Sequence, residues 1–144
     1  KNDIMARKHA IILIRNSNGE GLQYDDKVWD CYLFLNCKVM GMDDNEAIKK
    51  TVKDFLKTEV TTIDYKFDRV HSKYSVKDKI IKEYHHYFYL VNVYKQEDVE
   101  NQKEFVLNDI KFKWFSYEEL MQDERIKVIN ADIVGFVKEM LEKN

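Results

Sequence analysis

The chain has 144 residues, of which 35% are charged and 44% are hydrophobic, so we expect one globular domain over residues 1–144. Its 13% of aromatic residues exclude a disordered chain, and its net charge of −2 excludes a broad positive surface for a long nucleic acid. Any anion site on this chain must therefore be local.

Strands and tight turns open the chain. The β-branched run His9–Asn16 is too short for a typical helix, and turn-forming residues follow it at 17–21. Leu22–Tyr24 is expected to form the return strand, and Trp29–Val39 a third, more buried strand. Cys31 and Cys37 lie roughly 20 Å apart in such an extended run, at ~3.3 Å per residue, so they cannot form a disulfide with each other. Free thiols indicate a reducing, cytoplasmic compartment.

A helix and two long strands follow. Apolar residues at i, i+4, i+7 and i+8 predict an amphipathic helix from Asp43 to about Thr58. Val60–Tyr74 is expected to be a strand, with Thr61, Ile63, Tyr65 and Phe67 on one face. Lys82–Tyr94 gives the strongest strand pattern and is expected to be central. Alternation places residues 84, 86, 88 and 90 on one face of it, and residues 85, 87, 89 and 91 on the other.

The last third of the chain predicts a loop, a strand and two helices. Lys95–Lys103 is polar and is expected to be the loop, and Ile110–Phe115 the strand. Ser116 and Glu119 have the capping-box spacing, so a helix is expected to begin at Ser116. A closing helix is expected from Ala131, capped by Asn130. The fold class is therefore a mixed α/β arrangement.

In order and spacing, these pieces resemble the Nudix fold. An apolar strand and an Asn-x-x-Gly turn come first, and residues 34–39 (FLNCKV) stand where the family has Phe-Pro-Gly-Gly-Lys-Val. Glu46-Ala47 resembles the start of the family's helix, and residues 113–120 (KWFSYEEL) resemble its frequent Trp-Phe-Ser-x-Glu-Glu-Leu. The resemblance implies an α/β/α sandwich with a mixed β-sheet.

The catalytic signature of that family does not fit this sequence. In the family, several carboxylates on one helix face hold divalent cations that neutralise a pyrophosphate and activate water. Counting from Gly41, the required Glu, Arg and Glu are Ala47, Phe55 and Leu56. We therefore expect that ordinary Nudix hydrolysis is lost, that the chain is not an enzyme, and that it uses no cofactor.

Lysines occupy the helix where the family has carboxylates. Lys50, Lys53 and Lys57 follow i, i+3, i+7 spacing and share one face. One hypothesis is that this face binds a phosphorylated ligand without Mg²⁺. The alternative is a solvated lysine face opposite the core.

A Nudix fold with a degenerate signature is similar to the SMODS-associated Nudix sensor domain of CBASS anti-phage membrane effectors. That resemblance implies binding of a cyclic di- or oligonucleotide, self-association on ligand binding, and upstream transmembrane helices. The chain opens at Lys1 without a start Met, so we expect it to be trimmed from a longer chain that reaches the membrane only through segments absent here.

Twelve side chains are candidate ligand contacts. Nucleobases stack on aromatic rings and accept hydrogen bonds at their edges, and cationic groups contact phosphates. His85 and His86 point to opposite faces, so at most one faces a pocket, and adjacent histidines in one strand cannot chelate one zinc ion. Trp29 is either a stacking platform or a core anchor. The candidates are Arg7, His9, Arg15, Trp29, Tyr32, Asn36, Lys38, Lys50, Lys53, Tyr74, Tyr84 and His86.

The sequence thus predicts a non-hydrolytic sensor of a cyclic nucleotide or oligonucleotide. A second hypothesis is a divergent hydrolase of a nucleoside diphosphate compound, in which Asp54, Glu46 and Asp43 or Asp44 hold one Mg²⁺. A third is a protein-interaction domain with an empty cleft.

Overall fold

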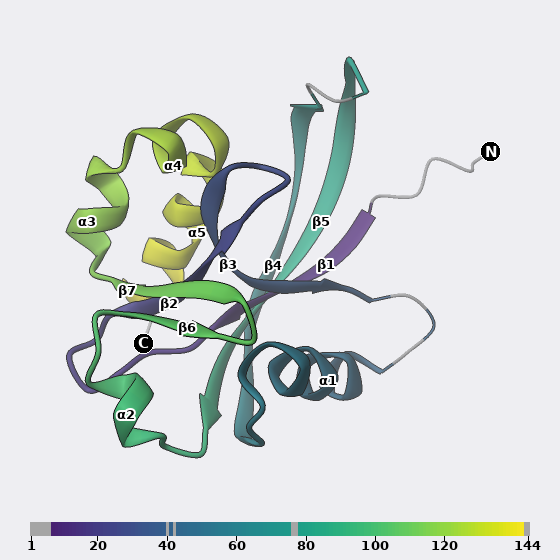
Figure 1. Cartoon of the computed structure of the whole chain (residues 1–144). Coiled ribbons are helices and arrows are strands. Elements are labelled where there is room, and N and C mark those ends of the chain that lie inside the picture. The colour runs from purple at the N-terminus through teal and green to yellow at the C-terminus, as the bar shows by residue number, and fades with distance from the viewer. Residues whose placement is uncertain (1–6, 40, 42, 76–77, 143–144) are drawn as a thin grey trace.

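A mixed β-sheet forms the centre of the computed structural model (Figure 1). The structure describes residues 7–39, 41, 43–75 and 78–142. Within them the strand order is β4-β5-β1-β3-β2-β7-β6, with β1 parallel to β5 and the other neighbouring strands antiparallel. The strands are β1 (Arg7–Leu13), β2 (Gly21–Asp26), β3 (Cys31–Lys38), β4 (Val60–Ser75), β5 (Ile80–Val93), β6 (Glu104–Leu107) and β7 (Ile110–Phe115).

Helices cover both faces of the sheet, as Figure 1 shows. On one face lies α1 (Asp44–Leu56), and on the other lie α3 (Tyr117–Gln122), α4 (Glu124–Ile129) and α5 (Ala131–Glu142). The short α2 (Glu97–Glu100) joins β5 to β6. None of the helices in the described ranges has the length and apolar character needed to cross a membrane. The predicted α/β sandwich with a mixed sheet is confirmed.

The sequence explains both ends of α1. Asp43 is the N-cap and accepts a hydrogen bond from the backbone N–H of Glu46, which satisfies one of the amides that a helix start leaves open. Lys57 ends the helix in the left-handed conformation, with φ of 58°. Between these ends, the buried side chains of Ile48 and Val52 pack against the sheet.

Alternation along β1 builds two cores. Ala10 and Ile12 are fully buried on the side of α1, whereas Ile11 and Leu13 pack on the side of α5. Burial of apolar side chains on both faces of one strand explains why β1 is apolar almost throughout. These two sides are called the α1 face and the α5 face below.

Several sequence expectations were wrong in detail. β5 lies second from the sheet edge rather than at the centre, because β4 covers its outer side. The polar loop contains α2, and β6 and α4 were not predicted. Their apolar patterns are too short to be distinctive, at four and six residues. Asn130, expected to cap the closing helix, is the C-cap of α4 and directly precedes α5, where its carbonyl oxygen accepts from the Val134 N–H at 3.1 Å.

A register shift in β4 changes which of its residues share a face. Tyr65 pairs with Tyr89 and Phe67 with Phe88, so one extra residue is inserted between them. Tyr65 therefore packs against Tyr87 and Tyr89, whereas Phe67 packs against Phe88 on the α5 face. The expectation that Tyr65 and Phe67 share a face is wrong for this reason.

Candidate functional site

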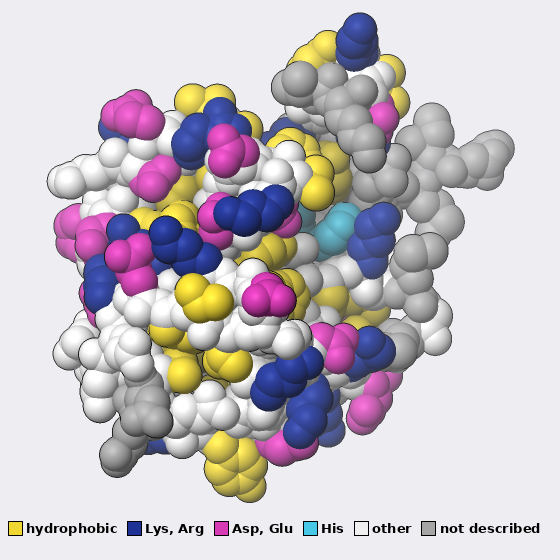
Figure 2. Space-filling model, in the orientation of Figure 1, with side chains coloured by type: hydrophobic (Ala, Val, Ile, Leu, Met, Phe, Trp, Pro, Cys, Tyr) yellow, Lys and Arg dark blue, Asp and Glu magenta, His cyan; other side chains and the backbone are white. Residues whose placement is uncertain are grey.

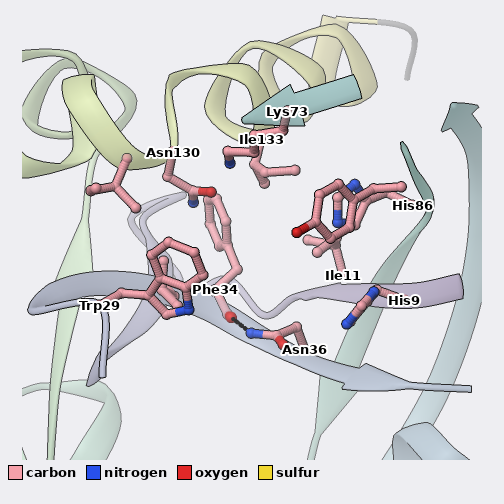
Figure 3. Close-up of a pocket in the computed structure, with 12 residues that line it drawn as sticks. His9, Ile11, Trp29, Phe34, Asn36, Lys73, His86, Asn130 and Ile133 are labelled. Atoms are coloured by element: carbon pink, nitrogen blue, oxygen red, sulfur yellow. Dashed lines mark hydrogen bonds between the residues drawn. The ribbon is translucent and has the colours of Figure 1, made fainter. Parts of the chain in front are cut away.

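A pocket of about 130 Å³ opens on the α5 face, between the sheet and the α4–α5 corner. Figure 3 shows His9 and His86 at one end, Trp29 and Asn130 at the other, and Phe34 between them. An enclosed space on the order of 150 Å³ takes a benzene-sized ring. The pocket is thus of a size for one ring system, with the rest of a ligand lying along its open rim.

The first end of the pocket is built from aromatic rings on neighbouring strands. Tyr84 and His86 lie two residues apart on β5, and their rings are parallel within 9° at a centroid distance of 5.7 Å. His9 enters from β1, and its ring centroid lies 5.7 Å from that of His86. Figure 2 shows a histidine side chain in a recess beside the projecting β4–β5 hairpin, with basic side chains nearby.

The other end is formed by Trp29, whose side chain is 41% exposed. The turn before it is held by Asp26, which accepts hydrogen bonds from the backbone N–H groups of Val28 and Trp29. Arg125 of α4 donates to the carbonyl oxygens of Trp29 and Asp30, at 2.9 and 3.1 Å. The indole thus stands at the pocket rim with its backbone fixed from two sides.

Two amide side chains supply polar groups between these ends. The Asn36 Nδ2 group donates to the Phe34 carbonyl oxygen at 2.9 Å, as Figure 3 shows. Asn130 lines the pocket from the α4–α5 corner and is 7% exposed. Lys73 of β4 adds a cationic group, and its Nζ lies 3.2 Å from the Asp132 carboxylate. The pocket therefore combines stacking surfaces, hydrogen-bonding groups and one lysine.

His86 is neutral at physiological pH. Burial first, and then the nearby rings of His71 and His9, together lower its pKa to about 3. Burial also lowers the pKa of His71. A neutral imidazole has one nitrogen that donates and one that accepts, so the protons of this cluster decide what the pocket recognises.

Carboxylates lie in the first turn of α1, where the chain has left the sheet. The start of β1 pairs with the end of β3, with His9 opposite Lys38, and the chain then enters α1. There the Asp44 carboxylate accepts from Lys8 Nζ at 3.3 Å and from the Tyr89 hydroxyl. Burial and the contact with Asp44 raise the pKa of Tyr89 well above its usual range.

The described residues contain no group of three His, Cys, Asp or Glu side chains that could hold a metal ion. Glu46 and Asp54 are eight residues apart in α1, which at ~1.5 Å per residue separates them by about 12 Å along the helix. These two carboxylates cannot share one ion, so the full donor set of the hydrolase hypothesis does not fit. Mg²⁺, however, is commonly bound by one or two carboxylates together with substrate phosphates. Asp43 and Glu46, exposed and one helical turn apart, fit that smaller requirement.

Some of the twelve predicted site residues come together in the pocket and others do not. Arg15 lies at the other end of β1, beside a second pocket of about 210 Å³. Tyr74 is 58% exposed near the hairpin tip, and Tyr32 packs edge-on against Phe115. The side chain of Arg7 lies outside the described part of the structure. The predicted residues that line the pocket are His9, Trp29, Asn36, Tyr84 and His86.

The predicted lysine face lies away from this pocket. Lys50 Nζ is 2.7 Å from Asp54, and Lys53 Nζ is 2.8 Å from Glu59. All four side chains are more than half exposed, so these ion pairs fit the solvated alternative. Lys38, at the end of β3, is exposed as well.

Sequence reasoning missed four polar residues of this region. Lys73, His71 and Asp132 were not among the twelve candidates, and Asn130 was considered only as a helix cap. The spacing of His71 and Lys73, two residues apart in one strand, was the available signal. The register shift in β4 hid the face to which they belong.

No protein-family model matches the sequence, and no curated protein sequence matches it significantly. Solved structures do match the fold. An Ap4A hydrolase from C. elegans is 15% identical with a TM-score of 0.59, covering 96% of this chain and 98% of its own. A Nudix hydrolase from Nitrosomonas europaea is 10% identical with a TM-score of 0.66, covering 96% and 90%. A UDP-X diphosphatase is 10% identical with a TM-score of 0.64, covering 96% and 66%. The chain therefore has the Nudix fold.

This comparison corrects two expectations. The chain was expected not to be an enzyme, yet each of these three neighbours is named as a hydrolase or a diphosphatase. It was also expected to use no cofactor, whereas Nudix hydrolases, such as the neighbour from Nitrosomonas europaea, typically use divalent cations. The degenerate signature alone was thus too weak a reason to exclude metal-dependent hydrolysis.

Proposed function

We propose that this chain is a divergent Nudix-fold hydrolase that cleaves a nucleoside diphosphate compound with the help of a divalent cation. The observation that carries the proposal is the pocket itself. It offers aromatic rings and amides for a base, and β3, which supplies Asn36 to it, leads along the chain into the first turn of α1 with its carboxylates.

The base would occupy the pocket and the phosphates would lie at its rim. Trp29 and Tyr84 offer aromatic faces, and a base stacked on such a face gains about 1–3 kcal/mol. Asn36 and Asn130 are placed to hydrogen-bond the edges of a base. Lys73 would attract the negative charge of the phosphates.

Asp43 and Glu46 would hold the cation together with the phosphate oxygens of the substrate. When bound, such an ion neutralises the diphosphate and lowers the pKa of a bound water. The protein orients the substrate around it. Lys8 and the Tyr89 hydroxyl fix the Asp44 carboxylate, and this contact ties the first turn of α1 to β1 and β5.

A turnover assay on the whole chain tests this proposal. Dinucleoside polyphosphates and nucleoside diphosphate sugars would be incubated with the protein in Mg²⁺ and in EDTA, and nucleoside monophosphate release would be followed by chromatography. We expect release in Mg²⁺ only. The Asp43→Asn/Glu46→Gln double variant should lower turnover by at least about tenfold.

Asp54→Asn is the matched control, because it removes a carboxylate from the same helix about 12 Å from Glu46. It should leave turnover unchanged. Absence of turnover on every compound, or equal losses in the control and the double variant, would contradict the proposal. Cyclic di- and trinucleotides belong in the same panel, because their recognition remains a prediction from the sequence.

A further inference from the structure

Three side chains from three elements form a hydrogen-bonding chain that ends in the pocket. Asp132 near the start of α5 places Oδ2 3.1 Å from Nδ1 of His71 on β4. His71 Nε2 in turn lies 2.6 Å from Nδ1 of His86 on β5. His86 lines the pocket beside Tyr84 and His9.

This order of contacts fixes where the protons lie. A carboxylate only accepts, so its neighbour His71 Nδ1 must carry the proton. Neutral His71 then has a lone pair on Nε2, and His86 Nδ1 must donate to it. In a neutral His86 the proton is thereby used, and Nε2 is left as an acceptor. That Nε2 makes no hydrogen bond to any residue in the described part of the chain.

The surroundings keep both rings neutral. His86 is 8% exposed, and Phe136 of α5 packs edge-on against the His71 ring at 5.4 Å. Charged and titratable groups face the pair from four elements: His9 from β1, Lys73 and Arg69 from β4, Tyr84 from β5, and Asp132 and Glu139 from α5. Arg69, opposite His86 in register, is paired with Glu139. Asp132 balances Lys73, with its two oxygens divided between Lys73 and His71.

Two features show that this arrangement comes from where the histidines lie in the sheet and not from their number. The register shift in β4 brings His71 onto the α5 face opposite Tyr84. Next to His86, His85 lies on the α1 face and contacts the Asp68 carboxylate directly through Nε2. His85 has no second histidine between it and its carboxylate, so it serves as an internal control.

We propose that Asp132 and His71 are positioning residues that hold His86 as the Nδ1–H tautomer, so that its Nε2 accepts a hydrogen bond from an exocyclic amino group of the bound base. The pocket would then select bases that carry such an amino group. This selectivity rests on the proposed function only in taking a nucleotide as the ligand; the tautomer is a property of the free protein.

The tautomer is measured directly by two-bond ¹H–¹⁵N NMR on histidine-labelled protein. We expect His86 and His71 to carry the proton on Nδ1 at pH 7, and His86 to stay neutral down to pH 5. His86 with its proton on Nε2 would overturn the proposal, whatever the turnover assay gives.

Asp132→Asn should reverse the direction of the hydrogen bonds from residue 132 through His71 to His86. In the wild type, Asp132 Oδ1 accepts a hydrogen bond from the Ile133 N–H at 2.9 Å. The one oxygen of Asn can keep this contact and the contact with Lys73. Its Nδ2 then donates to His71 Nδ1, the His71 proton moves to Nε2, and His86 becomes the Nε2–H tautomer. The matched control is Asp68→Asn, which changes the neighbour of His85 and should leave the His86 signals unchanged. Lys73→Met is a second control. It removes the lysine contact of Asp132 but keeps the carboxylate that faces His71, so the tautomers of His71 and His86 should not change.

Binding of nucleoside 5′-monophosphates tests the selectivity. Three pairs differ in one amino group: adenosine against purine riboside, guanosine against inosine, and cytidine against pyrimidin-2-one riboside. In calorimetry we expect the amino member of at least one pair to bind about tenfold more tightly, and Asp132→Asn to abolish that difference. Equal binding within every pair would overturn the selectivity while leaving hydrolysis intact. If none of the six nucleotides binds, the selectivity fails, whereas the proposed function is decided by the turnover assay alone.

Discussion

The two faces of β5 carry similar residues and have different properties. Tyr84, His86 and Phe88 alternate with His85, Tyr87 and Tyr89, so each face has one histidine beside aromatic rings. On the α5 face, helices bury His86 and Phe88. On the α1 face, His85 and Tyr87 stay half-buried, and the Asp68 carboxylate that His85 contacts is exposed.

The difference between the faces comes from what covers them. Among the described residues, α1 makes its hydrogen bond to this part of β5 through Asp44 and Tyr89, and the rings beyond Tyr89 remain partly open. α5 lies over the opposite face and brings Phe136 and Asp132 against the histidines. The same kinds of side chain therefore form a buried pocket wall on one face and a surface network on the other.

The largest effect is expected from removing the ring at the centre of the buried face. Phe88 is fully buried, so Phe88→Ala should lower the free energy of unfolding by about 3–5 kcal/mol. Tyr87→Ala, one residue earlier, removes a half-buried ring and should cost less than half as much. Urea unfolding measures both. Equal losses would show that the two faces are packed alike.

The next largest effect is expected from acid, which should destabilise the buried face through His86. His86 has a folded pKa of about 3, below its unfolded value of about 6.5, so the unfolded chain binds a proton that the folded chain does not. Stability is then complete above pH 6.5 and falls as the pH drops toward 3. Between pH 6.5 and pH 5 the loss from His86 should be about 2 kcal/mol.

Urea unfolding at pH 7, 6 and 5 tests this, and His85→Gln should show the same fall. Within this window the surface carboxylates with lowered pKa, such as Asp68 and Glu119, remain ionised in both states and contribute little. A wild-type stability that does not change between pH 6.5 and pH 5 would contradict the buried neutral His86.

Local patterns predicted much of this contrast, and long-range contacts supplied the rest. Two-residue alternation along β5 correctly separated His85 from His86, and the capping box at Ser116 and Glu119 is present as predicted. The partner Asp132 is far from His86 in sequence and reaches it only through the docking of α5. No local pattern carries that information.

The register shift in β4 was the second limit. Simple alternation from Tyr65 would place His71 on the α1 face, whereas one inserted residue places it on the α5 face. The lysines of α1 show a different limit: their spacing was read correctly, but spacing cannot tell a phosphate site from a set of surface ion pairs.

A smaller effect of the opposite sign is expected at Gln23. This residue lies opposite Phe34, is fully buried, and has neither side-chain polar atom hydrogen-bonded within the described part of the chain. The buried side chains of His71 and His86 have hydrogen-bonding partners, whereas this buried amide has none among the described residues. Gln23→Leu should therefore raise the free energy of unfolding by about 1 kcal/mol. Asn36→Leu is a useful contrast, because it removes an amide that does have a partner and should not stabilise the fold. Destabilisation by Gln23→Leu would indicate a bound water or ligand at the amide.

The smallest effect is expected at the exposed end of the pocket. Arg125 holds the backbone at Trp29 through two hydrogen bonds made at the surface, so Arg125→Ala should change stability by less than about 1 kcal/mol. The substitution should nevertheless make the Trp29 indole more mobile and more accessible to solvent. Because Trp114 is only 4% exposed, iodide quenching of fluorescence reports mainly on Trp29, and quenching should increase in the variant. Lys127→Ala, two residues along α4 and paired only with Glu124 among the described residues, should leave quenching unchanged. If Arg125→Ala also leaves it unchanged, the Asp26 turn alone fixes Trp29, and the rim of the pocket is as rigid as its buried end.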